Sequence, residues 1–184
     1  DIMAYGSYTR GYKGPAYNMF FNLTTVGTNV IEPETVNAYE MGLKNSFLDG
    51  ALIVNMAAYY AKYNNYQANN PDVVALVAVT RLTNAGSVST KGFELEFVAR
   101  PSRSFSLNGG LAYNKARVVN FRLPPGGNAT QLIPAGTPLA NAPEWKMTLG
   151  AQYDWETGGF ANVELGANMA MQSDQIYELS PSAA

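Results

Sequence analysis

Large apolar residues alternate strictly with carboxylates in the heptapeptide GFELEFV, residues 92–98. A β-strand sends successive side chains to opposite faces, so Phe93, Leu95 and Phe97 share one face while Glu94 and Glu96 share the other. In a soluble sheet the apolar face packs into a core. In a transmembrane barrel the apolar face meets lipid and the polar face meets a watery lumen. The rest of the chain has to decide between these two architectures.

The same alternation recurs along the chain and predicts seven long strands. Six of them cover residues 2–12, 36–47, 51–67, 105–121, 145–154 and 163–172, and the seventh contains Phe93. Three connections are short (48–50, 100–104 and 156–159), and three are long (13–34, 68–83 and 122–141). Short and long connections alternate strictly, which indicates an antiparallel up-and-down sheet. Bacterial outer-membrane barrels place the short turns in the periplasm and the long loops outside.

Strand length and side-chain chemistry favour the membrane architecture. Soluble strands average about 5–6 residues, whereas a strand that crosses a bilayer needs about 9–11. Charged residues make up only 14% of the chain, against about 25% in typical globular proteins. Asn, Gly, Ser and Thr dominate the polar faces, and the isolated charges expected to line the lumen are Glu40, Lys44, Glu94, Glu96, Lys146, Asp154 and Glu164.

Aromatic residues are 12% of the chain and include twelve tyrosines. Outer-membrane barrels carry aromatic girdles at both membrane interfaces. Six aromatic residues fall toward strand ends on the predicted lipid face, and we expect them to form such girdles: Tyr39, Tyr60, Tyr113, Trp145, Tyr153 and Trp155. A Tyr-rich soluble β-protein, with these rings in its core, is the alternative.

The residues that are absent exclude several classes of function. The chain has no His and no Cys, which removes Ser-His-Asp and Cys-His catalysis, disulfides and most zinc and haem ligation. Glu94 and Glu96 share a face without any such partner, so we predict no catalytic residue, no metal and no cofactor. A net charge of −2 gives no reason to expect a nucleic-acid partner. The longest apolar run, VVALVAV at 73–79, is too short for a membrane helix of about 20 residues. It is read either as a β-extension of the neighbouring strand or as a loop hairpin.

Four stretches resemble the barrel of TonB-dependent outer-membrane receptors. They are YGSYTRGYKGPAYN (5–18), PETVNAYEMGLKNSF (33–47), TNAGSVSTKGFELEF (83–97) and PLANAPEWKMTLGAQYDW (138–155), and they occur in the family's order. The resemblance implies a barrel of about 22 strands filled by an N-terminal plug domain. It also implies uptake of scarce nutrients, most of all ferric siderophores, with energy from TonB. The implied location is the outer membrane of a Gram-negative bacterium, in contact with lipid and lipopolysaccharide.

Seven strands are too few to close a barrel, and neither a plug nor a TonB box is recognisable. We therefore expect residues 1–184 to be one part of the barrel domain, from its C-terminal half. The predicted function is a receptor that binds a small-molecule metal chelate and imports it, and the chain is not expected to be an enzyme. A passive porin-like channel and a soluble β-structural or carbohydrate-binding module are the alternatives. Binding residues concentrate in loops, and the candidates are Tyr17, Asn18, Phe20, Asn22, Arg81 and Arg122.

Overall fold

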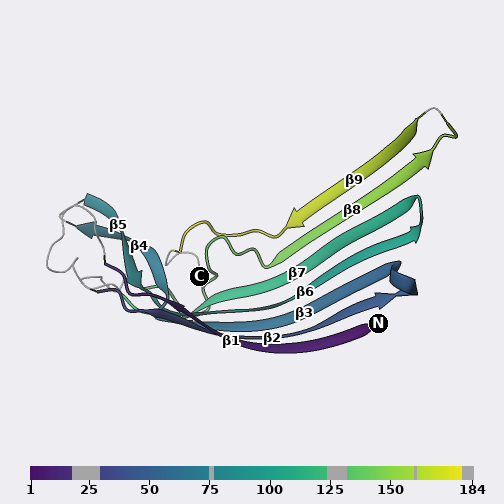
Figure 1. The fold of residues 1–184 in the computed structure, drawn as a ribbon. Helices are drawn as coiled ribbons and strands as arrows, with labels where there is room; N and C mark the ends of the chain where they lie inside the picture. The colour runs from purple at the N-terminus through teal and green to yellow at the C-terminus, as the bar shows by residue number, and fades with distance from the viewer. Residues whose placement is uncertain (18–29, 75–76, 124–131, 160, 180–184) are drawn as a thin grey trace.

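Seven long strands form one open antiparallel sheet in the computed structural model, with the order β1-β2-β3-β6-β7-β8-β9 (Figure 1). The structure describes residues 1–17, 30–74, 77–123, 132–159 and 161–179, with the backbone alone over 70–81. The strands are β1 (Ile2–Lys13), β2 (Glu34–Phe47), β3 (Leu52–Asn64), β6 (Gly86–Ser102), β7 (Phe105–Phe121), β8 (Trp145–Glu156) and β9 (Asn162–Gln172).

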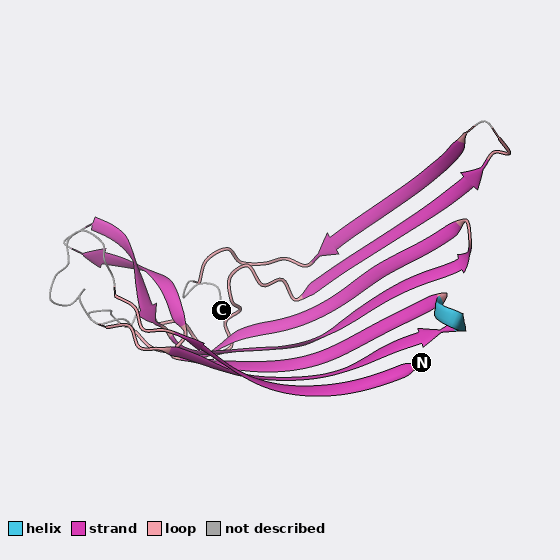
Figure 2. Cartoon of the chain, viewed as in Figure 1, coloured by secondary structure: helices cyan, strands magenta, loops and turns pink. Residues whose placement is uncertain are grey.

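The predicted all-β, antiparallel up-and-down fold is confirmed. Over the described ranges the single helical element is a three-residue 3-10 turn, Leu48–Gly50 (Figure 2), and no helix there is long and apolar enough to cross a membrane. This turn joins β2 to β3 at the predicted Asp-Gly hairpin. Asp49 (φ 52°) and Gly50 (φ 89°) both adopt the left-handed conformation that such turns require. The three short connections lie at one end of the sheet, and the long connections leave from the other (Figure 1).

The segment that the sequence left undecided forms a hairpin. Strands β4 (Gln67–Val74) and β5 (Val77–Asn84) pair with each other as a separate two-stranded sheet. The hairpin continues β3 and β6 beyond the main sheet, because Tyr66 N–H donates to the Gly86 carbonyl and Ala85 N–H donates to the Tyr66 carbonyl. Positive φ angles at Asn65 (53°) and Gly86 (104°) interrupt the strands there. The predicted strand over 51–67 is therefore broken at Asn65, and the hairpin turns away from the sheet (Figure 1).

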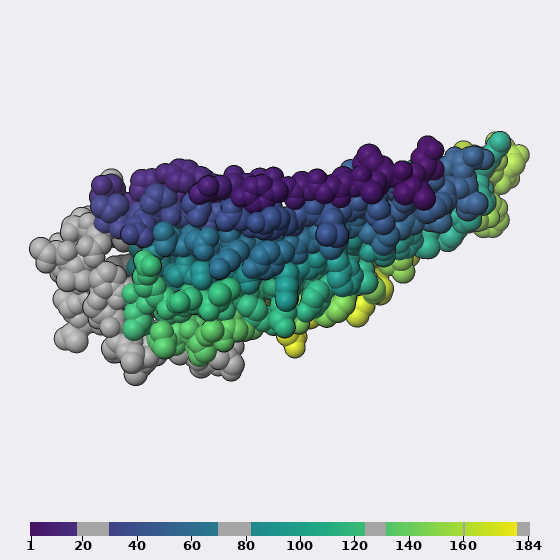
Figure 3. Space-filling view, turned by 90° about the horizontal axis from the view of Figure 1, so that it is seen from below, coloured from purple at the N-terminus to yellow at the C-terminus, as the bar shows by residue number. Residues whose placement is uncertain are grey.

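Strand register gives the sheet two chemically distinct faces. One continuous cross-strand row on the apolar face runs Ala4, Leu43, Met56, Leu95, Leu111, Met147, Met171, and the adjacent row on the polar face runs Tyr5, Gly42, Ala57, Glu94, Ala112, Lys146, Gln172. Among the residues that the structure describes, no second layer covers the apolar face. Met41 is 69% exposed and Met171 is 58% exposed. The ribbon shows the seven-stranded sheet as a single curved layer (Figure 1), and the space-filling view shows the chain colours running in order across one surface (Figure 3). An exposed apolar surface of this extent marks a site of contact with lipid or with a partner protein.

Buried residues gather at the end of the sheet with the long connections. Residues 133–144 run along the edge of β7 that β8 leaves free, since β8 pairs only with Phe105 to Tyr113. Val118 N–H donates to the Thr137 carbonyl at 2.9 Å, and Leu139 N–H donates to the Ala116 carbonyl at 3.1 Å. The resulting small core contains Ile31, Ala61, Ala85, Val88, Ala116, Val118, Ile133 and Thr137.

Candidate ligand-binding rim

Three long connections are hydrogen-bonded to one another at this end, which we call the rim. It comprises the described ends of the β1–β2 connection (14–17 and 30–33), the base of the β4–β5 hairpin (65–67 and 84–86) and the β7–β8 connection (122–123 and 132–144). The paired strands already hold the first two connections close together. Side chains then fix their relative position.

Two amides at the hairpin base, Gln67 and Asn84, hold the β1–β2 connection. The side chain of Asn84 accepts from Glu32 N–H at 2.7 Å and donates to the Glu32 carbonyl at 2.9 Å, which imitates a backbone bridge. The Gln67 amide donates to the carbonyls of Gly14 at 2.9 Å and Glu32 at 3.0 Å. Gln67 N–H donates to a Glu34 carboxylate oxygen at 2.7 Å. Gln67 is 94% buried from solvent. Its hydrogen bonds therefore form in a region of low dielectric constant, where each is electrostatically stronger than the same bond in water.

Gly86 lets the hairpin and β7 approach closely. Its φ of 104° favours glycine, and a Cβ built there would lie 2.1 Å from the Asn120 carbonyl oxygen. Arg122 N–H donates to the Ala85 carbonyl at 3.1 Å, which joins the third connection to the same point. Glycine is thus required here by both backbone angle and space.

The rim carries charges of both signs. Arg122 lies 3.7 Å from the Glu32 carboxylate, and both side chains are about 60% exposed. Such an exposed pair contributes little to stability and is easily reorganised. Tyr66 lies deeper. Burial raises the pKa of the Tyr66 hydroxyl, and the nearby Glu34 carboxylate raises it further, so this hydroxyl stays protonated at neutral pH.

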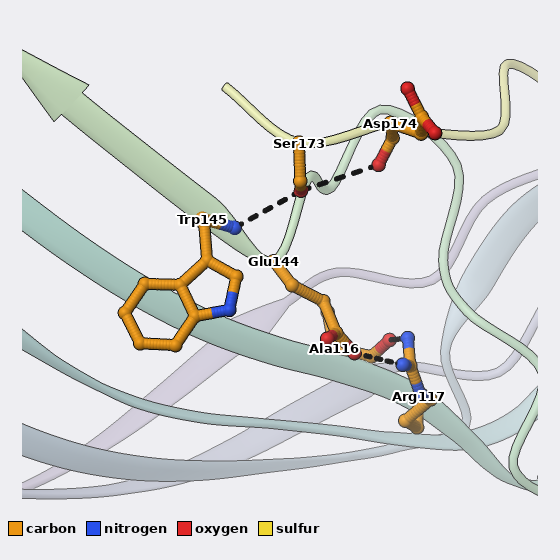
Figure 4. A network of polar contacts seen from close by, with 6 residues as sticks. All are labelled: Ala116, Arg117, Glu144, Trp145, Ser173 and Asp174. Atoms are coloured by element: carbon orange, nitrogen blue, oxygen red, sulfur yellow. Dashed lines mark hydrogen bonds and ion pairs between the residues drawn. The ribbon is translucent and has the colours of Figure 1, made fainter. Parts of the chain in front are cut away.

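A second polar network ties the β7–β8 connection to both flanking strands (Figure 4). The Arg117 guanidinium pairs with the Glu144 carboxylate and also donates to the Ala116 carbonyl. One residue further, Trp145 N–H donates to the Ser173 hydroxyl at 3.1 Å, and Ser173 N–H donates to the Trp145 carbonyl at 2.9 Å. The connection is therefore anchored to β7 on one side and to the residues after β9 on the other.

The predicted ligand residues have different positions. Tyr17 lies at the rim and is 63% exposed. Arg122 lies at the rim, paired with Glu32. The backbone of Arg81 lies in β5 opposite Asn70, and its side chain is outside the described part. Asn18, Phe20 and Asn22 fall outside the described residues.

The seven charged residues predicted to line the lumen all lie on the polar face, where several make contacts. The Tyr5 hydroxyl donates to the Glu40 carboxylate at 2.8 Å, and Lys44 Nζ lies 5.8 Å from the centroid of the Tyr5 ring. Glu94, Glu96 and Lys146 border a shallow groove floored by Gly110 and Ala112. Asp154 lies opposite Glu164 and accepts from the Gln152 amide at 3.1 Å. In the described parts of the chain no three Asp or Glu side chains cluster closely enough to hold a metal ion.

The six predicted girdle residues all lie on the apolar face, at two levels. Tyr39 and Tyr60 are cross-strand partners, and Tyr113 packs on Trp145 with ring centroids 4.8 Å apart. Tyr153 and Trp155 lie near the short turns. Eight residues separate Trp145 from Tyr153, or roughly 27 Å along a strand, which is close to the height of about 25 Å for the apolar band of outer-membrane barrels. Tyr39 and Tyr113 lie inside their strands and not at the ends, because β2 and β7 continue beyond this level.

Sequence reasoning missed the roles of Gln67, Asn84 and Glu144. A signal was present for Asn84, since the Asn-Ala-Gly triplet 84–86 stood out without an assigned contact. In the structure Asn84 binds Glu32, which directly precedes the Pro-Glu stretch at 33–34. Gln67, the partner of Asn84 in register, binds Glu34. Gln67 and Glu144 carry no local signal, because their partners are distant in sequence.

The comparisons identify the class of protein. The profile of the family described as TonB dependent receptor-like, beta-barrel, matches residues 1–181, and the chain belongs to this family. Its members are transport receptors of the Gram-negative outer membrane. The receptor resemblance seen in the sequence is thereby confirmed, and the soluble alternative is set aside.

Individual relatives of similar sequence are also named as receptors. The chain is 26% identical over 159 residues to the metal-pseudopaline receptor CntO of Pseudomonas aeruginosa, covering 86% of this chain and 20% of that protein. It is 26% identical over 168 residues to the ferric-pyoverdine 358 receptor of Pseudomonas putida, covering 86% and 19%. The chain thus spans about a fifth of the length of these curated relatives.

Solved structures share the fold. The ferric yersiniabactin uptake receptor FyuA from Yersinia pestis superposes with a TM-score of 0.76 at 15% identity, over 100% of this chain and 25% of that one. The ferric preacinetobactin receptor BauA from Acinetobacter baumannii gives 0.66 at 20% identity, over 95% and 24%.

Proposed function

We propose that this chain is part of an outer-membrane receptor that captures a metal chelate, of the ferric siderophore class, at the rim and imports it with energy from TonB. The observation that carries the proposal is the family match along residues 1–181. Relatives named for metal-pseudopaline and ferric-pyoverdine support the chelate class. Residues 1–184 would be one part of the barrel domain, with the plug and the TonB box elsewhere in the protein. No enzymatic activity is proposed.

The rim supplies groups suited to such a ligand. Siderophore complexes are bulky and often anionic, with aromatic or hydroxamate edges. Tyr17 offers an exposed ring, and Arg122 offers a guanidinium whose partner Glu32 is itself exposed and free to be displaced. Arg81, Asn18, Phe20 and Asn22 complete the proposed ligand set. On the polar face, the seven charged residues would line the lumen and face the plug.

The test uses the full-length protein in a strain that lacks its own copy. Cells are given radioactive iron bound to a panel of siderophores, and uptake is compared with and without functional TonB. We expect accumulation of at least one chelate that stops when TonB is inactivated. A porin-like channel, the competing function, would keep its flux without TonB. Absence of TonB-dependent uptake for every metal chelate offered would contradict the proposal.

A matched pair of variants tests the role of the rim in the same assay. Arg122→Ala is expected to lower uptake at subsaturating chelate about fivefold to tenfold, the effect of losing one solvent-exposed hydrogen bond of roughly 1 to 1.4 kcal/mol. Arg103→Ala removes the same charge at the β6–β7 turn, at the opposite end of the sheet, and should leave uptake unchanged. Equal effects of the two substitutions would remove Arg122 from the ligand set.

A further inference from the structure

The backbone of Glu32 is fixed at the rim on both sides. Its N–H donates to the Asn84 side chain at 2.7 Å, and its carbonyl accepts from the side chains of Asn84 at 2.9 Å and Gln67 at 3.0 Å. The preceding residue, Ile31, is 3% exposed and exchanges two backbone hydrogen bonds with Ala16, at 2.8 and 3.1 Å. Freeing backbone groups that are paired in this way is costly. The Glu32 carboxylate can therefore move only by rotation of its own side chain.

Arg122 is held beside Glu32 by the same hairpin base. Arg122 N–H donates at 3.1 Å to the carbonyl of Ala85, the residue after Asn84. Two consecutive residues of the hairpin base thus anchor the two members of the pair. The guanidinium nitrogen and the carboxylate oxygen are 3.7 Å apart, which is longer than a hydrogen bond of about 2.7–3.2 Å. The anchored backbone, and not the attraction between the two charges, sets their spacing.

Both charges are accessible to a ligand. The side chains of Glu32 and Arg122 are 59% and 60% exposed. Among the described residues neither side chain has a hydrogen-bond partner, so both retain their hydrogen-bonding capacity. An exposed ion pair of this geometry contributes little to stability. A pair that is fixed in place, exposed and weakly joined is suited to bind a group from outside the chain.

The pair matches a ligand group that carries both charges close together. In an α-amino acid the ammonium nitrogen and the carboxylate carbon are about 2.5 Å apart, because both are bonded to one carbon. A guanidinium can donate two parallel hydrogen bonds to such a carboxylate, while a carboxylate accepts from the ammonium group. A purely anionic group at Arg122 would instead lie near Glu32, whose backbone cannot withdraw, and like charges about 4 Å apart repel each other.

We propose that Glu32 and Arg122 together bind an α-amino acid group carried by the chelate. Arg122 binds its carboxylate, and Glu32 binds its ammonium group. This assignment rests on the proposed receptor function and specifies the class of chelate, which is one with a free α-amino acid group that does not coordinate the metal. It also adds Glu32 to the ligand set, as the residue that disfavours chelates with negative charge alone.

The test uses the full-length protein, purified in detergent, and isothermal titration calorimetry. The probes are three ferric trihydroxamates that differ in one pendant group. The first carries a free α-amino acid, the second has the amine of this group acetylated, and the third has its carboxylate converted to a primary amide. We expect the first chelate to bind at least fivefold more tightly than either capped chelate, the effect of one lost exposed contact. This comparison requires no substitution in the protein.

A substitution at Glu32 then locates the effect. E32Q should weaken binding of the free amino acid chelate at least fivefold. It should not weaken binding of the amine-acetylated chelate, which has no ammonium group for Glu32 to bind. Glutamine can keep the backbone hydrogen bonds of this position to Asn84 and Gln67. E156Q is the matched control, because it removes an exposed carboxylate at the β8–β9 turn, at the opposite end of the sheet.

Equal binding of the three chelates by the unaltered protein would overturn the proposal, as would a lack of binding by the free amino acid chelate. Equal weakening of all three by E32Q would also overturn it, since that result indicates a structural role. TonB-dependent uptake only of chelates without an amino acid group would count against this proposal and leave the transport function standing. Preferential binding of the amino acid chelate without any TonB-dependent uptake would count against the transport function alone.

Discussion

At the scale of single residues, the side-chain amide of Asn84 replaces backbone pairing with Glu32 at a point where no strand residue is available to pair. It accepts from Glu32 N–H and donates to the Glu32 carbonyl, and a second donation reaches the Asn65 carbonyl at 2.9 Å. One side chain thus satisfies three backbone groups where regular pairing has ended. Backbone groups at such a junction would otherwise lose partners, at a cost of about 1–3 kcal/mol for each one that is buried.

Asn84→Ala is therefore expected to loosen the β1–β2 connection without unfolding the barrel. Amide hydrogen exchange at Glu32 in the full-length protein should accelerate by about tenfold or more, corresponding to roughly 1.4 kcal/mol of local stability. Asn120→Ala is the matched control, since Asn120 is exposed and its side chain has no hydrogen-bond partner among the described residues. Unchanged exchange at Glu32 would show that the amide is dispensable.

Gly86 gives a second prediction at this scale. A methyl group at Gly86 would meet the Asn120 carbonyl oxygen at 2.1 Å and would hold φ at an unfavourable 104°. Gly86→Ala should destabilise the barrel by about 1–3 kcal/mol or more. The measurement is the temperature at which the folded band disappears in heat-modifiability gels. Gly166→Ala, where the nearest atom is 4.0 Å away, should leave that temperature unaltered. A similar loss for both would contradict the steric explanation.

At the scale of the element, each strand separates two environments. Leu149 lies on the apolar face midway between Trp145 and Tyr153, and Thr148 beside it lies on the polar face. Leu149→Arg should destabilise the inserted barrel by about 2–4 kcal/mol, because the guanidinium enters the centre of the lipid. Thr148→Arg should be tolerated, since it faces the groove edge across Gly110 from Glu96. Urea unfolding of the full-length protein in lipid vesicles measures both variants. A smaller loss for Leu149→Arg than for Thr148→Arg would reverse the assigned faces.

Much of the sheet could be predicted because a period of two is a local property. Alternation predicted the seven strands, and turn residues predicted the short connections between them. Alternation alone also placed residues such as Glu94 and Glu96 on the same face. The sequence did not decide whether the segment of β4 and β5 is a strand extension or a hairpin, because VVALVAV is uniformly apolar and shows no alternation. The sequence predicts a long connection over 122–141 and no pairing within it, because the bonds of residues 136–139 to β7 come from tertiary register and not from the pattern of the segment. Contacts such as that between Gln67 and Glu34 join positions 33 residues apart, and local periodicity cannot predict contacts over such a separation.

At the scale of the whole molecule, the sheet is open. In the described structure β1 pairs only with β2 and β9 only with β8, which leaves an unpaired edge at each side. Unpaired backbone groups in lipid cost several kcal/mol each, and open edges in water promote aggregation. Residues 1–184 expressed alone should therefore fail to form a heat-modifiable monomer in detergent or vesicles, whereas the full-length protein should form one. A stable, monomeric, protease-resistant form of the isolated segment would contradict this.

The pairing of residues 133–144 with β7 also bears on how such receptors diversify. A connection that makes no hydrogen bonds to the strands can gain or lose residues without disturbing the pairing of the sheet. Here Gly136, Thr137 and Leu139 are fixed in register to Val118 and Ala116, so a single inserted residue would shift every later bond and detach Glu144 from Arg117. Among relatives, this stretch should therefore change by substitution while keeping its length. New ligand specificities would arise from insertions elsewhere in the long connections.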